Sequence, residues 1–480
     1  MNDNSSRKSI VGGMIWKMGE RLLGQGVSFV VSVILARLLV PDDYGLIALT
    51  TVFLNLANVF IVSGFSTALI QKKDADDRDF STVFFCSQLC AIVLYGILYA
   101  TAPLVAAFYE RTELVRLLRV FALLVPISVY NNIQNAHIAR HMQFRKTFIA
   151  SIISAVLSGT AGIVLAYLGF GVWALVMQYM LNTVINTIVL CFTVSWHPTL
   201  TFCADSAKKM MAYGSRVLLA DLSGTFFGEL RSLIIGRAYT SADLAFYSKG
   251  QQLPTLITTN LSNTIIAVMF PALSNESDHL EQVKLMTKRS MKVLSFVMVP
   301  CMLGMAAVME PLILLLFTDK WAQTIPYGQV LSLAYCVNMF TAVSLQVLKA
   351  IGRSDVVLKL EVIKKPVYVL LLVIGVKINV FAVALTMLLY DCYGTMVNMG
   401  QLKKYIGYSL AEQFRDLMPA FALGTAMAVV VLLIPMFDSL IVTLIVKVLA
   451  GVLVYAGGAM MFKVETFRYL WETVSGMLRR

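Results

Sequence analysis

The chain is 480 residues long, and 58% of its residues are apolar whereas only 14% are charged. A soluble chain would carry about 25% charged residues, so this composition argues against a water-soluble enzyme with a charged surface. It also argues against nucleic-acid binding as the reason for the net charge of +12. Together with a mean hydropathy of +0.77, it predicts an all-α protein that crosses a membrane many times.

Segments of about 20 mostly apolar residues are long enough to cross the hydrocarbon core of a bilayer. The breaks between the segments of this chain are short, so no linker can hold a soluble domain. The first segment is expected to be retained, because it contains charged residues and lacks a cleavage site. About fourteen spans are predicted, at residues 12–38, 43–66, 80–108, 113–136, 146–168, 171–195, 210–236, 243–272, 290–317, 326–350, 357–375, 378–400, 416–435 and 438–461.

Lysine and arginine gather on one side of this predicted topology. With the N-terminus in the cytoplasm, the cytoplasmic segments hold 27 of these residues and the opposite side holds 7. Such a bias sets the orientation of membrane proteins. An even number of spans then places both termini in the cytoplasm, and the basic excess is largely a topology signal with some attraction to anionic lipids.

Two stretches about 200 residues apart share their layout. Residues 34–45 (ILARLLVPDDYG) resemble residues 234–247 (IIGRAYTSADLAFY), and Pro103 and Arg140 have counterparts in Pro311 and Arg353. These matches predict a repeated unit of six helices, although apolar helices also resemble one another by composition alone. The predicted division is an N-terminal bundle at 1–200, a C-terminal bundle at 201–408, and a further helix pair with a cytoplasmic tail at 409–480. Parallel repeats of this kind enclose a central cavity in carriers that work by alternating access.

Several catalytic signatures are missing from the sequence. It lacks the G-x-x-x-x-G-K-[S/T] pattern of ATP-binding loops and the G-x-S-x-G pattern of serine hydrolases. His137 and His141 have the spacing of metalloprotease ligands, but Ile-Ala-Arg stands between them and the glutamate is absent. We expect these histidines to be solvated at a cytoplasmic helix end. The seven cysteines have no paired C-x-x-C spacing, and we expect no metal, cofactor or enzyme activity.

Ionisable residues within the predicted spans are the strongest functional signal. Each costs about 3 kcal/mol or more at the bilayer centre, so such residues usually face a cavity or a partner. They form polar stripes with helical spacing on the first and seventh predicted helices, and one lysine follows at the start of the eighth. The candidate cavity cations are Lys17, Arg21, Arg216, Arg231 and Lys249, and the candidate acids, which could also couple an ion, are Glu20, Asp221 and Glu229.

Structural roles compete with a cavity role for these residues. The first stripe could snorkel to the interface, and Asp221 and Glu229 could form ion pairs with nearby cations. Lys364, Lys365 and Lys447 are expected to snorkel, or to be assigned to spans only because the predicted boundaries are displaced. The excess of cations over acids nevertheless favours an anionic cargo, because convergent lysine and arginine side chains bind phosphate or diphosphate groups strongly. A lipid carrying such a headgroup could keep its tail in the bilayer while the head crosses a polar cavity.

Six short motifs stand out along the chain: residues 19–26 (GERLLGQG), 35–45 (LARLLVPDDYG), 64–71 (GFSTALIQ), 81–84 (STVF), 140–145 (RHMQFR) and 169–175 (GFGVWAL). They resemble motifs of bacterial polysaccharide flippases. The relatives are the Wzx/WzxC-like polysaccharide transporters of the MOP (multidrug/oligosaccharidyl-lipid/polysaccharide) exporter superfamily. The resemblance covers nearly the whole chain and is strongest over residues 15–180.

The resemblance implies two six-helix bundles followed by an extra helix pair. It also implies that the chain moves undecaprenyl-diphosphate-linked oligosaccharides from the cytoplasmic to the periplasmic leaflet of the bacterial inner membrane, for O-antigen, capsule or exopolysaccharide assembly. The implied partners are the lipid-linked substrate, membrane lipids and a polysaccharide polymerase. Arg21 and Lys249 lie at positions compatible with a role in receiving the diphosphate.

Two other functions remain as alternatives. A drug/cation antiporter of the same superfamily would favour acidic over basic cavity groups, and here the balance is the opposite. A membrane glycosyltransferase or O-antigen ligase would need large external loops with catalytic carboxylates, whereas the predicted external loops are short.

Overall fold

The computed structural model describes residues 23–62 and 76–468, together with the isolated positions 19, 69, 472 and 475. Over these residues the secondary structure is helical and contains no strand. Nine of the described helices are long and apolar enough to cross a membrane. The prediction of an all-α, multi-pass membrane protein is therefore confirmed, whereas the count of fourteen spans stays a prediction.

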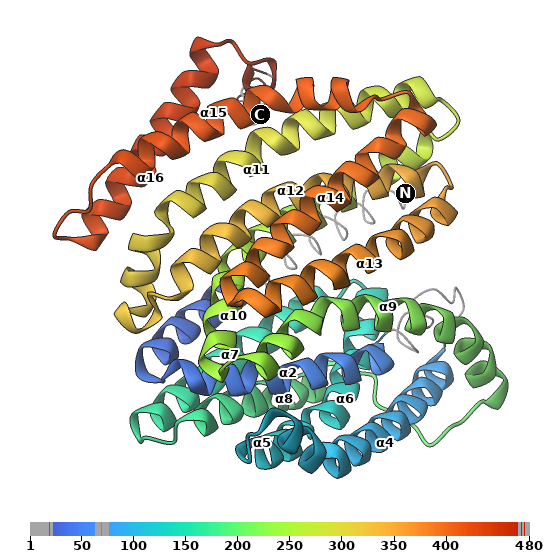
Figure 1. The fold of residues 1–480 in the computed structure, drawn as a ribbon. Helices are drawn as coiled ribbons and strands as arrows, with labels where there is room; N and C mark the ends of the chain where they lie inside the picture. The colour runs from blue at the N-terminus through green and yellow to red at the C-terminus, as the bar shows by residue number, and fades with distance from the viewer. Residues whose placement is uncertain are drawn as a thin grey trace. The chain divides into compact units, whose positions relative to one another are not determined.

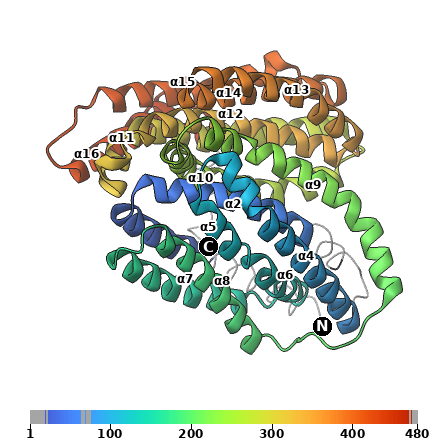
Figure 2. The ribbon, with the colours of Figure 1, turned by 60° about the horizontal axis from the view of Figure 1, so that its bottom comes forward.

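The chain divides into two compact units, residues 1–245 and 246–480. In the first unit, α2 packs against α4, α8 and α9, and α7 packs along α8. Figure 2 shows α4, α5 and α6 next to one another in this unit. Its described helices are Leu23–Leu38, α2 (Pro41–Ile61), α4 (Asp77–Tyr109), α5 (Glu113–Phe121), α6 (Leu124–Arg140), α7 (Phe144–Tyr167), α8 (Val172–Thr193) and α9 (Ala204–Ala238).

The second unit is built around α11, α12 and α14. Neighbouring helices in the order α11, α12, α14, α13 contact one another, and α15 and α16 pack against the outside of α11 (Figure 1). A core of buried methionine, valine and aromatic side chains, including Met298 and Phe340, fills this unit. Its helices are α10 (Ser241–Asn275, which begins in the first unit), α11 (Leu280–Phe317), α12 (Thr324–Ala350), α13 (Ser354–Ile378), α14 (Val380–Ile406), α15 (Leu410–Leu433) and α16 (Leu440–Met461).

The helix boundaries follow local sequence signals. Asp76 and Asp79 form a reciprocal capping box at the start of α4, and Ser409 and Glu412 form another at the start of α15. Each satisfies two backbone N–H groups that would otherwise lack a partner at the helix end. The predicted span at 113–136 is wrong as a single helix, because a turn at Ala122 and Leu123 separates α5 from α6.

The two stretches with similar sequences also have matching helix boundaries. One helix ends at Leu38 and α2 begins at Pro41, just as α9 ends at Ala238 and α10 begins at Ser241. Proline lies inside the last two turns of both α4 and α11. These correspondences support the six-helix repeat. The domain boundaries at 200 and 408 stay a prediction, and α9, which follows the first boundary, contacts α2 and α4.

Candidate functional site

The candidate cavity residues of the first predicted helix lie outside the described residues. Lys17, Glu20 and Arg21 belong to this group. On α9, the side chain of Arg216 is likewise outside the described part of the structure. The role of these four residues in a cavity therefore stays a prediction.

The remaining stripe residues on α9 have different surroundings. Asp221 is exposed, whereas Glu229 and Arg231 are half-buried. The Glu229 carboxylate accepts a hydrogen bond of 2.8 Å from Nδ2 of Asn55 on α2. Glu229 is thus bound to α2, whereas the predicted division places α9 in the second bundle, and the sequence spacing could not predict this contact.

The C-terminal end of α9 is attached to the first repeat by further polar contacts. Arg237 forms an ion pair of 3.0 Å with Glu110 at the end of α4, and the Tyr109 hydroxyl donates to the Leu233 carbonyl oxygen at 3.3 Å. We call the contacts of Glu229, Leu233, Arg237 and Ser241 with Asn55 and with residues 109–111 the α9 latch.

Arg111 and Gly45 complete the α9 latch. Arg111 pairs with Asp42 and donates a hydrogen bond of 2.9 Å to Ser241 Oγ. At Gly45 the backbone of α2 lies so close to Ser241 that a β-carbon would overlap the Ser241 carbonyl group. The topology count used Arg111 and Arg237 only as external charges. In the sequence, only Arg237 carried a signal of a special role, because it lies in the repeated motif at residues 234–247.

Lys249 occupies a site of its own in the second unit. Its side chain is only 6% exposed and donates a hydrogen bond of 3.1 Å to Gln252. The ammonium group lies 5.3 Å from the ring centre of Phe317 and 5.9 Å from that of Trp321. These distances fit cation–π contacts, which strengthen when the cation is removed from water. Lys249 of α10 is therefore held in an aromatic cage made by the end of α11 and the short 3-10 helix that follows it (Asp319–Trp321).

The other charged residues of the spans are buried rather than snorkelling. Lys364 is 3% exposed and Lys447 is 5% exposed, so the expectation that they snorkel is wrong. Lys364 pairs with Glu361 at 2.6 Å, and its aliphatic stem packs beside Gly394 on α14. Lys447 lies on the buried face of α16. Lys365 is half-exposed, and its snorkelling stays a prediction.

Polar side chains join α12 and α14. Asn338 donates a hydrogen bond of 2.8 Å to Asp391, which is 5% exposed. Thr341 and Thr395 share a second hydrogen bond of 2.8 Å. Asp391 is a charged residue inside the predicted span 378–400. Its amide partner could not be found without the structure, because 53 residues separate the two in sequence.

The histidine pair differs from the sequence expectation. His141 is exposed as expected, but His137 is 7% exposed. The His137 ring lies 5.4 Å from Phe80 and 6.3 Å from Trp196 between ring centres. Hence His137 is a packed side chain and not a solvated one. Over the part of the chain that the structure describes, no three His, Cys, Asp or Glu side chains are grouped to hold a metal ion.

Lowering the pH is expected to destabilise the first unit through His137. Burial, and to a lesser degree the neighbouring His141, lower the pKa of His137 below its ordinary value of 6.5. The folded state therefore favours the neutral ring, and stability is complete above the unfolded pKa and decreases as the pH falls through it. Unfolding temperatures measured in detergent above about pH 7 and below about pH 6 would show this loss of stability. His137→Phe should reduce this pH dependence and the exposed-residue control His197→Gln should not, whereas equal slopes would contradict the assignment.

The chain matches the model of a family described as "Polysaccharide biosynthesis protein" over residues 34–326. It is 22% identical to the succinoglycan biosynthesis transport protein ExoT of Rhizobium meliloti (strain 1021), over 74% of this chain and 72% of ExoT. It is also 22% identical to the lipopolysaccharide biosynthesis protein WzxC of Escherichia coli (strain K12), over 89% of this chain and 87% of WzxC.

Solved structures share the fold. The lipid II flippase MurJ in an inward closed conformation superimposes with a TM-score of 0.71 at 15% identity, covering 94% of this chain and 98% of MurJ. An inward-facing multidrug resistance transporter of the MATE family superimposes with a TM-score of 0.60 at 17% identity, covering 84% of this chain and 95% of that one. The chain has the fold of MOP-superfamily transporters, and it belongs to the polysaccharide biosynthesis protein family.

Proposed function

We propose that this chain is a flippase for lipid-linked oligosaccharides in the assembly of a surface polysaccharide. The observation that carries the proposal is the combination of the family match with a fold shared with a lipid II flippase. Its relatives in polysaccharide biosynthesis include a transport protein, which favours translocation over sugar transfer. The cargo that fits the excess of cationic candidate residues is an oligosaccharide on undecaprenyl diphosphate.

The location follows from the charge distribution. The bias of 27 to 7 lysine and arginine residues supports a bacterial inner-membrane protein with both termini in the cytoplasm. In this orientation the α9 latch lies at the periplasmic end of its helices. A polysaccharide polymerase on the periplasmic side is the partner that would consume the delivered units.

The latch suggests how access could alternate. It connects the first helix of the second repeat to the first repeat through exposed or half-buried pairs such as Arg237–Glu110. Exposed ion pairs contribute little stability, about 0–1 kcal/mol each, so such a seal can open and close. We propose that these contacts close the periplasmic end while a phosphorylated headgroup enters from the cytoplasm.

Lys249 is the described cation that best fits contact with the headgroup. Its aromatic cage holds a charge in a setting of low dielectric constant, where an anion binds more strongly than in water. Because the side chain is 6% exposed, an anion reaches it only after the cage has opened. This behaviour fits a site that is occluded in one state of a carrier.

A drug/cation antiporter is the second candidate, since the MATE transporter has the same fold. The family match to polysaccharide biosynthesis proteins favours the flippase. We do not propose an enzyme.

Deletion of this chain tests the proposal. We expect cells without it to lose surface glycan and to accumulate unpolymerised lipid-linked repeat units. The sugars of these units should be inaccessible to a lectin that is added to the outside of spheroplasts. Loss of a polymerase would instead leave accessible units, and this serves as the control. Accessible units after deletion, or changed drug sensitivity with normal glycan, would contradict the flippase.

A further inference from the structure

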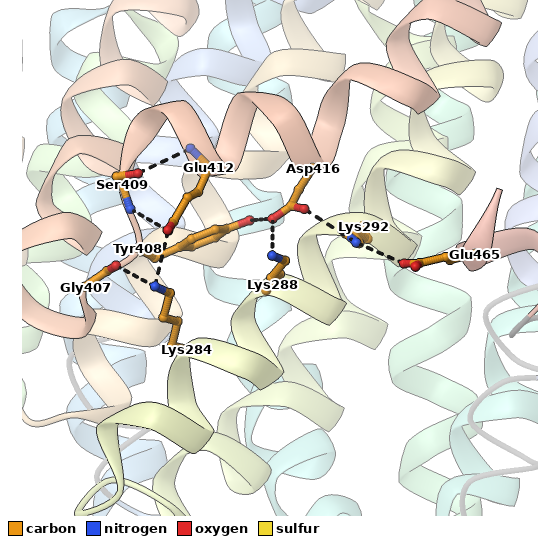
Figure 3. Close-up of polar contacts among 9 residues, drawn as sticks. All are labelled: Lys284, Lys288, Lys292, Gly407, Tyr408, Ser409, Glu412, Asp416 and Glu465. Atoms are coloured by element: carbon orange, nitrogen blue, oxygen red, sulfur yellow. Dashed lines mark hydrogen bonds and ion pairs between the residues drawn. The ribbon is translucent and has the colours of Figure 1, made fainter.

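Charged side chains form a ladder between α11 and α15 in the second unit (Figure 3). Lysines follow one another at four-residue intervals on α11, and two acids do so on α15. Lys284 pairs with Glu412 at 3.2 Å, and Lys288 and Lys292 lie 3.4 Å and 3.5 Å from the Asp416 carboxylate. Since one helical turn separates successive members, the ladder fixes the register of α15 against α11.

The two acidic partners of Lys292 differ in burial. The Asp416 side chain is 8% exposed and accepts a hydrogen bond of 2.8 Å from the hydroxyl of Tyr408, which is fully buried. Glu465, which lies 3.3 Å from Lys292, has a side chain that is 88% exposed. Asp416 is thus a fixed part of the ladder, while Glu465 can exchange Lys292 for another partner.

Beneath this end of the ladder lies a cavity of about 600 Å³. Lys292, Asp416 and Glu465 are at its charged rim, and its walls include Phe296, Leu423 and Phe462. Alanines at 420, 422 and 426 leave space along the face of α15. From Asp416 to Ala426 this face extends about 15 Å, at 1.5 Å per residue, which is about half the thickness of a hydrocarbon core.

The position of the cavity along the helices matches the boundary between headgroups and lipid tails. α11 has 38 residues and is therefore about 57 Å long, much longer than the hydrocarbon core of about 30 Å. Its basic N-terminal turns, which carry Lys284 to Lys292, belong in the headgroup layer. α15 and α16 are both apolar enough to cross the membrane. The cavity accordingly extends from the headgroup layer into one leaflet.

We propose that this cavity binds a bilayer phospholipid with an ethanolamine headgroup. At the rim Lys292 supplies a positive group and Asp416 and Glu465 supply negative ones, so the cavity offers separate partners for a phosphate and for an ammonium group. The lipid phosphate accepts a hydrogen bond from Lys292 in place of Glu465, and the lipid ammonium donates to Glu465. One acyl chain lies along the alanines of α15, between Phe296 and Phe462.

The charge pattern selects this headgroup over the other common ones. A choline headgroup has no N–H to donate to Glu465, and a phosphatidylglycerol headgroup has no cation to replace Lys292 there. Charge-assisted hydrogen bonds are about twice as strong as neutral ones. The proposal concerns a lipid of the surrounding bilayer and does not depend on which molecule the chain transports.

A tryptophan introduced at Phe462 reports the occupant. The Phe462→Trp protein is reconstituted into vesicles that contain equal mole fractions of brominated phosphatidylethanolamine, phosphatidylglycerol or phosphatidylcholine, and the quenching of the native tryptophans is subtracted. We expect at least about twofold stronger quenching by the ethanolamine lipid, because its additional charge-assisted hydrogen bond to Glu465 raises its occupancy of the cavity. Met461→Trp is the matched control, because Met461 is adjacent and 79% exposed but does not line the cavity. It should show no headgroup preference.

Loss of the rim charges completes the test. Lys292→Gln with Glu465→Gln should abolish the ethanolamine preference of the Phe462→Trp protein. If the double variant does not fold, Glu465→Gln alone suffices, because that side chain is almost fully exposed. Equal quenching by all three lipids, or a preference that survives loss of Glu465, would overturn the proposal. If undecaprenyl phosphate relieves the quenching and unbrominated phosphatidylethanolamine does not, the occupant is a polyprenyl lipid and the proposal is overturned.

Discussion

Gly45→Ala is expected to open the α9 latch and to abolish most glycan export. The added methyl group would overlap the carbonyl group of Ser241. A flexible side chain could move aside, but this neighbour is backbone at the start of α10, so the helices must separate. Overpacking of this kind costs about 1–3 kcal/mol. Because about 1.4 kcal/mol is a factor of ten in an equilibrium, the latched state should lose roughly tenfold to a hundredfold in population.

Cross-linking measures the latch directly. Asn55→Cys and Glu229→Cys replace two side chains that lie 2.8 Å apart, and a short bifunctional thiol reagent would join them when the latch is closed. The yield should fall about tenfold when Gly45→Ala is added. Gly96→Ala on α4 is the matched control, since a β-carbon there meets nothing within 4 Å. Equal yields in the two alanine variants, with normal surface glycan, would show that Gly45→Ala leaves the α9 latch closed and would contradict the prediction.

The helix positions were predictable because apolar runs end at polar breaks. The predicted spans at 146–168 and 438–461 correspond to α7 (Phe144–Tyr167) and α16 (Leu440–Met461). The break between α5 and α6 was missed, since the residues around Ala122 and Leu123 are as apolar as a span. One signal was present in the sequence: Pro126 lies in the first turn of α6, where proline is tolerated because its missing N–H has no helical partner.

The candidate site was predictable only in part. Sequence spacing can assign Glu229 to a polar face of a helix, but its partner Asn55 is 174 residues away. Burial has the same limitation: Lys364 has the sequence of a snorkelling lysine, but in the structure its side chain packs beside Gly394 on α14 and is 3% exposed. Such contacts are set by tertiary packing, and neither hydropathy nor local spacing contains that information.

Lys249→Met is expected to reduce glycan export at least about tenfold while leaving the protein folded. Methionine fills nearly the same volume and keeps the contacts with Phe317 and Trp321, but it removes the charge. Replacing a buried charge by an apolar side chain of similar size is often neutral or stabilising. A purely structural Lys249 would therefore tolerate methionine, whereas a lysine that receives a phosphorylated headgroup would not, because charge-assisted bonds to the phosphate would be lost.

Two measurements separate these roles of Lys249. Surface glycan and the accumulation of lipid-linked units report transport, and thermal unfolding in detergent reports stability. Lys359→Met removes an exposed lysine of the same unit and should leave both unchanged. Normal export by Lys249→Met would eliminate the headgroup role and leave the cage as packing. Lost export with an unfolding temperature within a few degrees of the wild type would place the positive charge itself, rather than the shape of the side chain, in the transport cycle.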